Sequence, residues 1–238
     1  MRVKRVAQLI CVLIVLAFAF VSAVLIGLAP SDIQAVHGAI PSADCSRPIA
    51  LGSNLIANGD AEADIGVTNR VSVVSPSCWT VESNLTVVSY TVPGSPTTTF
   101  GLNYFAGGPN TSASTATQTI DVSSLARLID GNVVTVLLMG QLGGYLTESD
   151  RITVKATFRS QTLEQLRELT IGPVTAFDRY SMTVLLPLSG ITKVPTSTRQ
   201  IVITMVAIRQ EGTFNDGYAD DLSLILEAYQ VFLPVIRR

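Results

Sequence analysis

The sequence predicts an all-β domain, a sandwich or a barrel, from three observations. Val, Ile, Thr, Ser and Gly dominate the middle of the chain, which is the composition of β-sheets. Short runs with strand-like patterns alternate with turn residues along most of the length. Only residues 160–169 look helical over any distance. Many short strands with almost no long helix are typical of sandwiches and barrels.

Residues 1–29 form a targeting segment. Three basic residues lie among the first five, and an almost entirely apolar run follows to Ala29. Two interpretations stay open. One is a signal peptide cut after Ala23, and the other is an uncleaved membrane anchor, since the run is long enough to span ~30 Å of hydrocarbon. Because the positive charges precede the apolar run, both interpretations export the domain, so we expect a secreted or cell-surface protein.

Residues 30–50 have the small residues and prolines of a linker. This linker contains Cys45, and Cys78 is the other cysteine outside the targeting segment. Export implies an oxidising environment, so we expect a Cys45–Cys78 disulfide, with two unrelated thiols as the alternative.

The β-domain is expected over residues 51–227. Its candidate strands are residues 71–75, 79–82, 85–90, 103–105, 116–122, 133–142, 151–159, 180–188, 199–208 and 218–226. In residues 151–159, Ile152, Val154 and the next alternate positions place apolar side chains on one face. Residues 160–169 lie between two strand patterns and are interpreted as a hairpin, whereas residues 123–130 are expected to contain a helical turn. Residues 228–238 are interpreted as a tail outside the core.

Acidic residues at both ends of the domain suggest a cation. Asp60, Glu62 and Asp64 alternate in the opening segment, so in an extended chain they share one side and repel each other. Asp220 has the same parity as Leu222 and the following leucines, which predicts a buried carboxylate that needs a partner. Calcium would satisfy these oxygens. The alternative is a solvated turn and a capped hairpin.

These segments carry a resemblance to a known family. The order NLIANGDAEAD, Trp79, GLNYFAGG, ATQTIDVS and YADDLSL, over about residues 54–226, resembles the galactose-binding-like jelly-roll families, in particular bacterial carbohydrate-binding modules. The resemblance implies a jelly-roll β-sandwich that binds carbohydrate. It also implies a structural calcium held by Glu62 and Asp220, with a backbone carbonyl near Gly59 or Asp60. Ala61 departs from the family, which usually has an aromatic residue there.

Several kinds of chemistry are excluded or disfavoured. The only histidine is His37, in the linker, so the domain cannot contain a Ser-His-Asp or Cys-His arrangement or a histidine-based zinc site. No phosphate loop or dinucleotide motif occurs, and no basic block suggests nucleic acid. Carboxylate pairs of the glycosidase type remain, such as Glu148 with Asp150 or Asp216 with Asp220. We interpret Glu148 and Asp150 as surface acids in a turn, and expect no catalysis.

Aromatic residues near turns are the candidates for ligand contact. Tyr145 and Phe214 lie in Gly- or Asn-rich loops, and Asn215 and Asp216 follow Phe214 with polar side chains. Rings stack on the apolar face of a sugar while amides and carboxylates bind its hydroxyls. Packing in the core is the alternative for each ring.

The sequence therefore predicts an exported, non-catalytic module that binds carbohydrate or another cell-surface polymer. A structural or adhesive surface protein of the same fold that binds no sugar is the alternative, and a small glycoside-active enzyme is a third hypothesis. Membrane contact is expected only through the N-terminal segment, if it is not cleaved.

Overall fold

The computed structural model describes residues 45–229. The predicted signal or anchor segment, most of the predicted linker and all but the first two residues of the predicted tail lie outside this range. Within it, none of the helices has the length and apolar character needed to cross a membrane.

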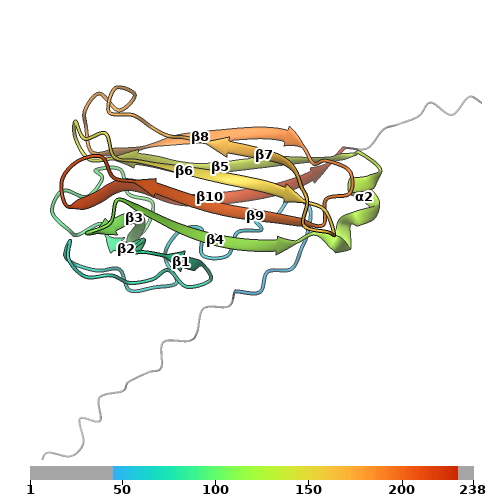
Figure 1. Cartoon of the computed structure of the whole chain (residues 1–238), viewed down its shortest axis with the longest axis horizontal. Helices are drawn as coiled ribbons and strands as arrows, with labels where there is room; N and C mark the ends of the chain where they lie inside the picture. Colours follow the sequence, from blue (N-terminus) through green and yellow to red (C-terminus); the bar gives the residue numbers. More distant parts are fainter. Residues whose placement is uncertain (1–44, 230–238) are drawn as a thin grey trace, which may run out of the picture. The chain divides into compact units, whose positions relative to one another are not determined.

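The described residues form ten strands and one short helical segment (Figure 1). The strands are β1 (Thr80–Glu82), β2 (Thr86–Ser89), β3 (Asn103–Pro109), β4 (Ala113–Asp121), β5 (Val134–Gly144), β6 (Arg151–Arg159), β7 (Gln165–Ile171), β8 (Val184–Lys193), β9 (Gln200–Ile208) and β10 (Phe214–Ala228). The predicted helical turn is the 3-10 turn η1 (Ser123–Leu125) followed by α2 (Ala126–Asp130). The predicted hairpin is the connection between β6 and β7.

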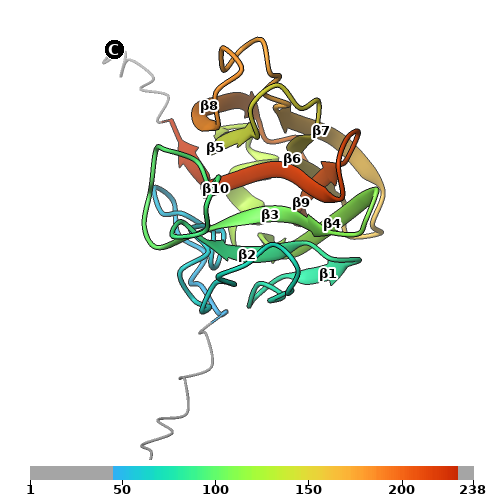
Figure 2. The ribbon, with the colours of Figure 1, turned by 90° about the vertical axis from the view of Figure 1, so that its left-hand side faces the viewer.

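The strands form two five-stranded antiparallel sheets. Sheet A has the order β2-β3-β10-β5-β8 and sheet B the order β1-β4-β9-β6-β7. Four antiparallel strand pairs are nested along the chain. The outermost is β3–β10, and inside it follow β4–β9, β5–β8 and β6–β7. A long hairpin rolled up in this way is the jelly roll. The predicted all-β jelly-roll sandwich is therefore confirmed, and Figure 2 shows the two layers from one end.

The core lies between the sheets and follows the alternation of the strands. In β6 the alternate residues Ile152, Val154, Ala156 and Phe158 are buried in this core, as the sequence predicts. Trp79 packs edge-on against Phe105 of β3, with ring centroids 6.0 Å apart.

A second apolar cluster covers part of the outer face of sheet A. It contains Val67, Val88, Val92, Tyr104, Ala106, Leu185, Phe214 and Tyr218. The rings of Tyr104 and Tyr218 meet edge-on at 5.1 Å. Loops therefore bury the β2–β3 side of this face, while the β5–β8 side is left open.

The disulfide between Cys45 and Cys78 is present, with the two Cα atoms 5.2 Å apart. This prediction is confirmed. The bridge fixes the start of the described chain beside β1.

Two strand predictions are wrong. Residues 71–75 form no strand, because Val71 is 77% exposed and the segment is joined to β2 only through Val74, whose carbonyl accepts from Val87 at 2.9 Å. The strand predicted from residue 180 begins at Val184, because residues 180–183 belong to a hydrogen-bonded loop.

The predicted parity of Asp220 is also wrong, although its burial is confirmed. The β10 register shifts between Asp220 and Ser223, where Asp221 has a φ of 50°. Such a bulge reverses the alternation. Ala219 and Leu222 therefore face the core, whereas Asp220 lies on the outer face of sheet A with Tyr218.

Candidate functional site

Three of the four predicted ligand-binding residues gather around an arginine of the same chain. The guanidinium of Arg70 lies 5.2 Å from the ring centroid of Tyr145 and 5.0 Å from that of Phe214. Its Nη1 donates to Oδ1 of Asp216 at 2.6 Å. In this arrangement Arg70 occupies these rings and this carboxylate, which would otherwise be the surface offered to a sugar.

Asn215, the fourth predicted residue, is fully buried. It packs against Gly107 of β3, where a Cβ atom would come within 2.2 Å of the Asn215 amide. Its Oδ1 accepts a hydrogen bond from the Gly217 N–H at 3.3 Å. Asn215 is therefore an interior residue between neighbouring strands, and only Gly fits opposite it.

Glu148, Asp150 and Asp216 form an acidic cluster, with carboxylate oxygens within 4.8 Å of one another. Asp150 is 2% exposed, and its carboxylate accepts from the N–H groups of Gln210 at 2.5 Å, Glu211 at 3.0 Å and Asp216 at 2.9 Å. The interpretation of Asp150 as a surface acid is therefore wrong. It joins the loop before β6 to the β9–β10 loop.

Glu148 is half-buried in the same cluster. Burial and the neighbouring carboxylates of Asp216 and Asp150 raise the pKa of Glu148 to about 7. Its Oε2 is buried and has no hydrogen-bond partner within residues 45–229. A carboxylic acid with a raised pKa beside a second carboxylate is the arrangement of a glycosidase pair. Here, however, three backbone donors already bind Asp150, which leaves it poorly placed to attack a substrate.

The acidic cluster could hold a metal ion, but Arg70 already balances part of its charge. Arg70 binds Asp216, and the Tyr218 hydroxyl donates to the same oxygen of Asp216. A divalent ion would have to displace these partners.

The residues predicted to hold calcium lie outside this acidic cluster, and their carboxylates accept hydrogen bonds from protein groups. Oε1 of Glu62 accepts from the N–H groups of Leu102 at 2.8 Å and Asn103 at 2.9 Å. Oδ2 of Asp220 accepts from the hydroxyl of Tyr90 at 2.6 Å. Asp60 is exposed and accepts only a long hydrogen bond of 3.4 Å from the Glu62 N–H. An ion between Glu62 and Asp220 would have to compete with the tyrosine for the Asp220 carboxylate.

Within residues 45–229, the most exposed aromatic side chains lie in the β7–β8 loop, residues 172–183. Phe177 is 88% exposed and Tyr180 is 84% exposed. The N–H of Tyr180 donates to the carbonyl of Phe177 at 3.1 Å, so the two residues bracket one turn. Oδ2 of Asp178 accepts from both the N–H and the hydroxyl of Thr175, at 2.8 and 2.7 Å. The loop therefore has its own internal hydrogen bonds.

A buried arginine fixes this loop to the domain. Arg179 is 1% exposed, and its guanidinium donates to the carbonyls of Leu146, Met182 at 2.8 Å, Tyr145 at 3.1 Å and Glu148 at 2.8 Å. Four carbonyls from two loops thus converge on one side chain. Leu146 and Met182 are themselves 44% and 51% exposed, so an apolar surface surrounds the anchored arginine.

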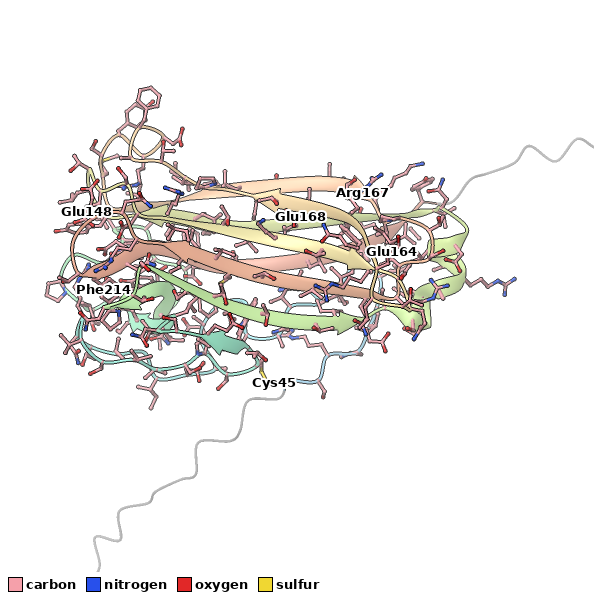
Figure 3. All side chains as sticks on the ribbon, in the orientation of Figure 1. Cys45, Glu148, Glu164, Arg167, Glu168 and Phe214 are labelled. Carbon is pink, nitrogen blue, oxygen red and sulfur yellow. A yellow bond between two sulfur atoms is a disulfide. The ribbon has the colours of Figure 1, made fainter. Side chains whose placement is uncertain are left out.

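Phe177 and Tyr180 are not among the residues predicted to contact a ligand. The strand predicted from the sequence included residue 180, and residue 177 lay outside every predicted strand and motif. The available signals were the Gly172-Pro173 turn and two aromatic residues three apart beyond the end of a strand pattern. The loop lies at the same end of the sandwich as Glu148 and Phe214, which Figure 3 labels.

Hollows also lie elsewhere on the domain, and two of them concern residues named above. One, of about 520 Å³, adjoins the disulfide, and the Gln118 amide within it is fully bonded to the backbone of Ala57 and Cys78. The other, of about 460 Å³, opens on the outer face of sheet A, with Gln141 and Asp221 in its lining. It is distinct from the loop end just described.

Comparisons with known proteins give only distant similarities. No family model matches the chain, and no curated protein matches it. The enzymatically active domain of tailspike protein 4 of bacteriophage CBA120 is similar with a TM-score of 0.43 and 16% identity, over 74% of this chain and 21% of that one. A xylan-binding family 22 module of Paenibacillus barcinonensis is similar with a TM-score of 0.39 and 10% identity, over 67% of this chain and 91% of that one. A family 22 carbohydrate-binding module of Clostridium thermocellum is similar with a TM-score of 0.40 and 16% identity, over 66% of this chain and 91% of that one. Similarity at this level does not identify a ligand or an activity for this chain.

Proposed function

We propose that the protein is an exported, non-catalytic jelly-roll module, secreted or held at the cell surface, that binds carbohydrate through the β7–β8 loop. The observation that carries the proposal is the pair Phe177 and Tyr180, almost fully exposed on a loop that Arg179 fixes from below. Aromatic rings held in this way match the apolar faces of sugar rings.

The rigidity of the loop supports a binding role. Ordering a mobile loop on binding costs affinity, and a loop already held in its bound shape avoids that cost. Arg179 supplies the order by donating to carbonyls of both this loop and residues 145–148. Large apolar side chains would otherwise be buried, so their exposure on an ordered loop marks a contact surface.

The position of the loop also supports the proposal. In Figures 1 and 2 the connection between β7 and β8 lies on the side of the domain opposite to the start of the described chain, where Figure 3 labels Cys45. A domain tethered through its N-terminal side would hold this loop away from the point of attachment, towards an external polymer.

The test is a glycan array followed by titration of the sugars that bind. We expect Phe177→Ala and Tyr180→Ala each to weaken binding at least about tenfold, as loss of a central aromatic contact does. Phe100→Ala is the matched control, because Phe100 is 39% exposed and lies in a different loop. The melting temperature of each variant would show that the fold is intact.

The alternative is a structural or adhesive protein of the same fold that binds no sugar. The same exposed rings would then contact another protein. No binding across the array, or binding that both loop variants retain in full, would overturn the carbohydrate proposal. Product formation from a bound oligosaccharide, abolished by Glu148→Gln, would instead show an enzyme.

Calcium at Glu62 and Asp220, with Asp60 nearby, belongs to the same proposal. Burial is the main reason why the pKa of Asp220 is raised to about 7, and the carboxylates of Asp221 and Glu62 add to it, so a cation at this place would relieve their repulsion. Calcium that binds only the folded state raises stability by ~2.7 kcal/mol at a hundredfold excess over its dissociation constant. Melting curves that are the same in calcium and in chelator, with metal removal verified, would show that the Tyr90 hydroxyl and the Asp221 N–H, which donate to the Asp220 carboxylate, are partners enough.

A further inference from the structure

The open half of the outer face of sheet A carries an apolar strip. Its apolar part is the cross-strand row Ile225–Leu137–Ile191, in the order β10, β5, β8, together with Met139. The flanking rows, Glu227–Thr135–Lys193 and Ser223–Met139–Ser189, are otherwise polar. Ile191 is 68% exposed, and Leu137, Met139 and Ile225 are half-buried. Nothing within residues 45–229 covers the central row completely. An ordered sheet face of this kind normally has a partner.

A polar pocket closes one end of the strip. It has a volume of about 460 Å³, and Gln141, Ser189 and Asp221 lie in its lining. Oε1 of Gln141 is buried and accepts no hydrogen bond from residues 45–229. Asp221 is exposed. The pocket therefore offers a carboxylate and an unpaired acceptor, which together suit a group with several N–H donors.

We propose that the C-terminal segment of the same chain, residues 230–238, docks along this strip and places its terminal arginines in the pocket. The segment reads QVFLPVIRR, with five large apolar residues followed by two arginines. Apolar residues match the strip, and guanidinium groups match Asp221 and Gln141.

The position where the segment begins fits this path. β10 ends at Ala228, and the N–H of Tyr229 donates to the carbonyl of Val133, beside the Thr135 row. From that row to Gln141 is six residues of β5, about 20 Å at ~3.3 Å per residue. The nine residues 230–238 span at most about 30 Å. They can therefore reverse direction and still reach the pocket.

Pro234 is compatible with this arrangement. Proline lacks an N–H and disrupts a strand that pairs in the middle of a sheet. A segment that lies across the face contacts side chains and needs no ladder of backbone hydrogen bonds. The proposal does not depend on carbohydrate binding, because the loop with Phe177 and Tyr180 lies elsewhere.

The experiment compares the full chain with a full-chain variant, Phe232→Ser with Leu233→Ser, by NMR of labelled methyl groups. We expect the methyl signals of Leu137, Met139, Ile191 and Ile225 to shift in the variant. Met205, which is fully buried between the sheets, is the control and should not shift. A synthetic peptide of residues 230–238, added to the variant, should restore the original signals.

Charge and surface variants complete the test. Changing Asp221→Lys should weaken peptide binding about tenfold if the arginines contact it, and Ile191→Asp should weaken it as well. Unchanged strip methyl signals in the variant, or a peptide that does not bind, would overturn the proposal. Shifts in the wild-type chain that depend on protein concentration would place the segment on a second copy, which contradicts docking within one chain.

Discussion

At the scale of single residues, the buried carboxylates distinguish this domain from an ordinary sandwich. Asp150, Asp216 and Asp220 are all less than 5% exposed. Each has a specific set of donors, so each carboxylate couples segments that are far apart in the sequence. Burial of a carboxylate is tolerated only where such donors or a positive charge compensate it.

Replacing Asp150 should destabilise the fold strongly. Asp150→Ala leaves three backbone N–H groups without an acceptor, so we expect a loss of about 3 kcal/mol. Urea unfolding would measure it. Glu164→Gln is the control, because Glu164 is exposed in the β6–β7 turn. A loss below about 0.5 kcal/mol, as for ordinary surface residues, would show that water replaces the carboxylate.

Asp220 should make stability depend on pH. Burial raises its pKa from 3.8 to about 7, although the Tyr90 hydroxyl acts to lower it. Because the folded pKa is the higher one, this group's contribution is complete below the unfolded pKa and is lost as the pH rises through about 7. Asp220→Asn should therefore flatten the fall in melting temperature between pH 5 and pH 8. Part of the dependence of melting temperature on pH should remain, since the pKa of Glu148 is raised as well. An unchanged slope would mean that Asp220 titrates normally.

At the scale of elements, strands with regular alternation could be predicted from the sequence, and irregular segments could not. The bounds of β6 are those predicted, because the apolar period of two extends over the whole strand. The side of the sheet on which Asp220 lies was predicted wrongly, because the bulge at Asp221 shifts the register of β10 and no local sequence signal marks the position of a bulge. Asp150 was misread because its partners are 60 and more residues away.

The candidate site divides in the same way. Tyr145, Phe214 and Asp216 could be proposed from their residue types and neighbours, although Phe214 and Asp216 lie in β10 and not in a loop. Arg70, which they surround, lies about 75 residues before Tyr145, and no local pattern points to it. Pairing over such distances is a property of the topology. Phe177 and Tyr180 were missed because their exposure depends on the anchoring of a loop by Arg179.

The β7–β8 loop should lose its order when its anchor is removed. Arg179→Gln leaves several carbonyls without a donor, and local opening of the loop becomes easier. We expect chymotrypsin to cut at Phe177 and Tyr180 about tenfold faster in the variant. Arg167→Gln is the control, because Arg167 is exposed on β7. Equal cutting rates would show that the internal hydrogen bonds of the loop are sufficient.

At the scale of the whole molecule, the disulfide should stabilise the domain by restricting the unfolded chain. The two cysteines are 33 residues apart, and closing a loop of this length contributes about 3–4 kcal/mol by chain entropy. We expect the urea midpoint to fall on reduction, and to be insensitive to reductant in Cys45→Ser with Cys78→Ser. A midpoint that reductant does not change in the wild-type protein would contradict this expectation.

The place of β10 in sheet A has a consequence for how the chain is made. β10 is the last strand within residues 45–229, yet it lies between β3 and β5 and pairs with both. Until it leaves the ribosome, sheet A consists of two separate pieces, and the sandwich cannot close. Long-range pairing of this kind delays folding until synthesis is complete. The edges of β3 and β5 that β10 covers therefore stay unpaired until β10 has been made.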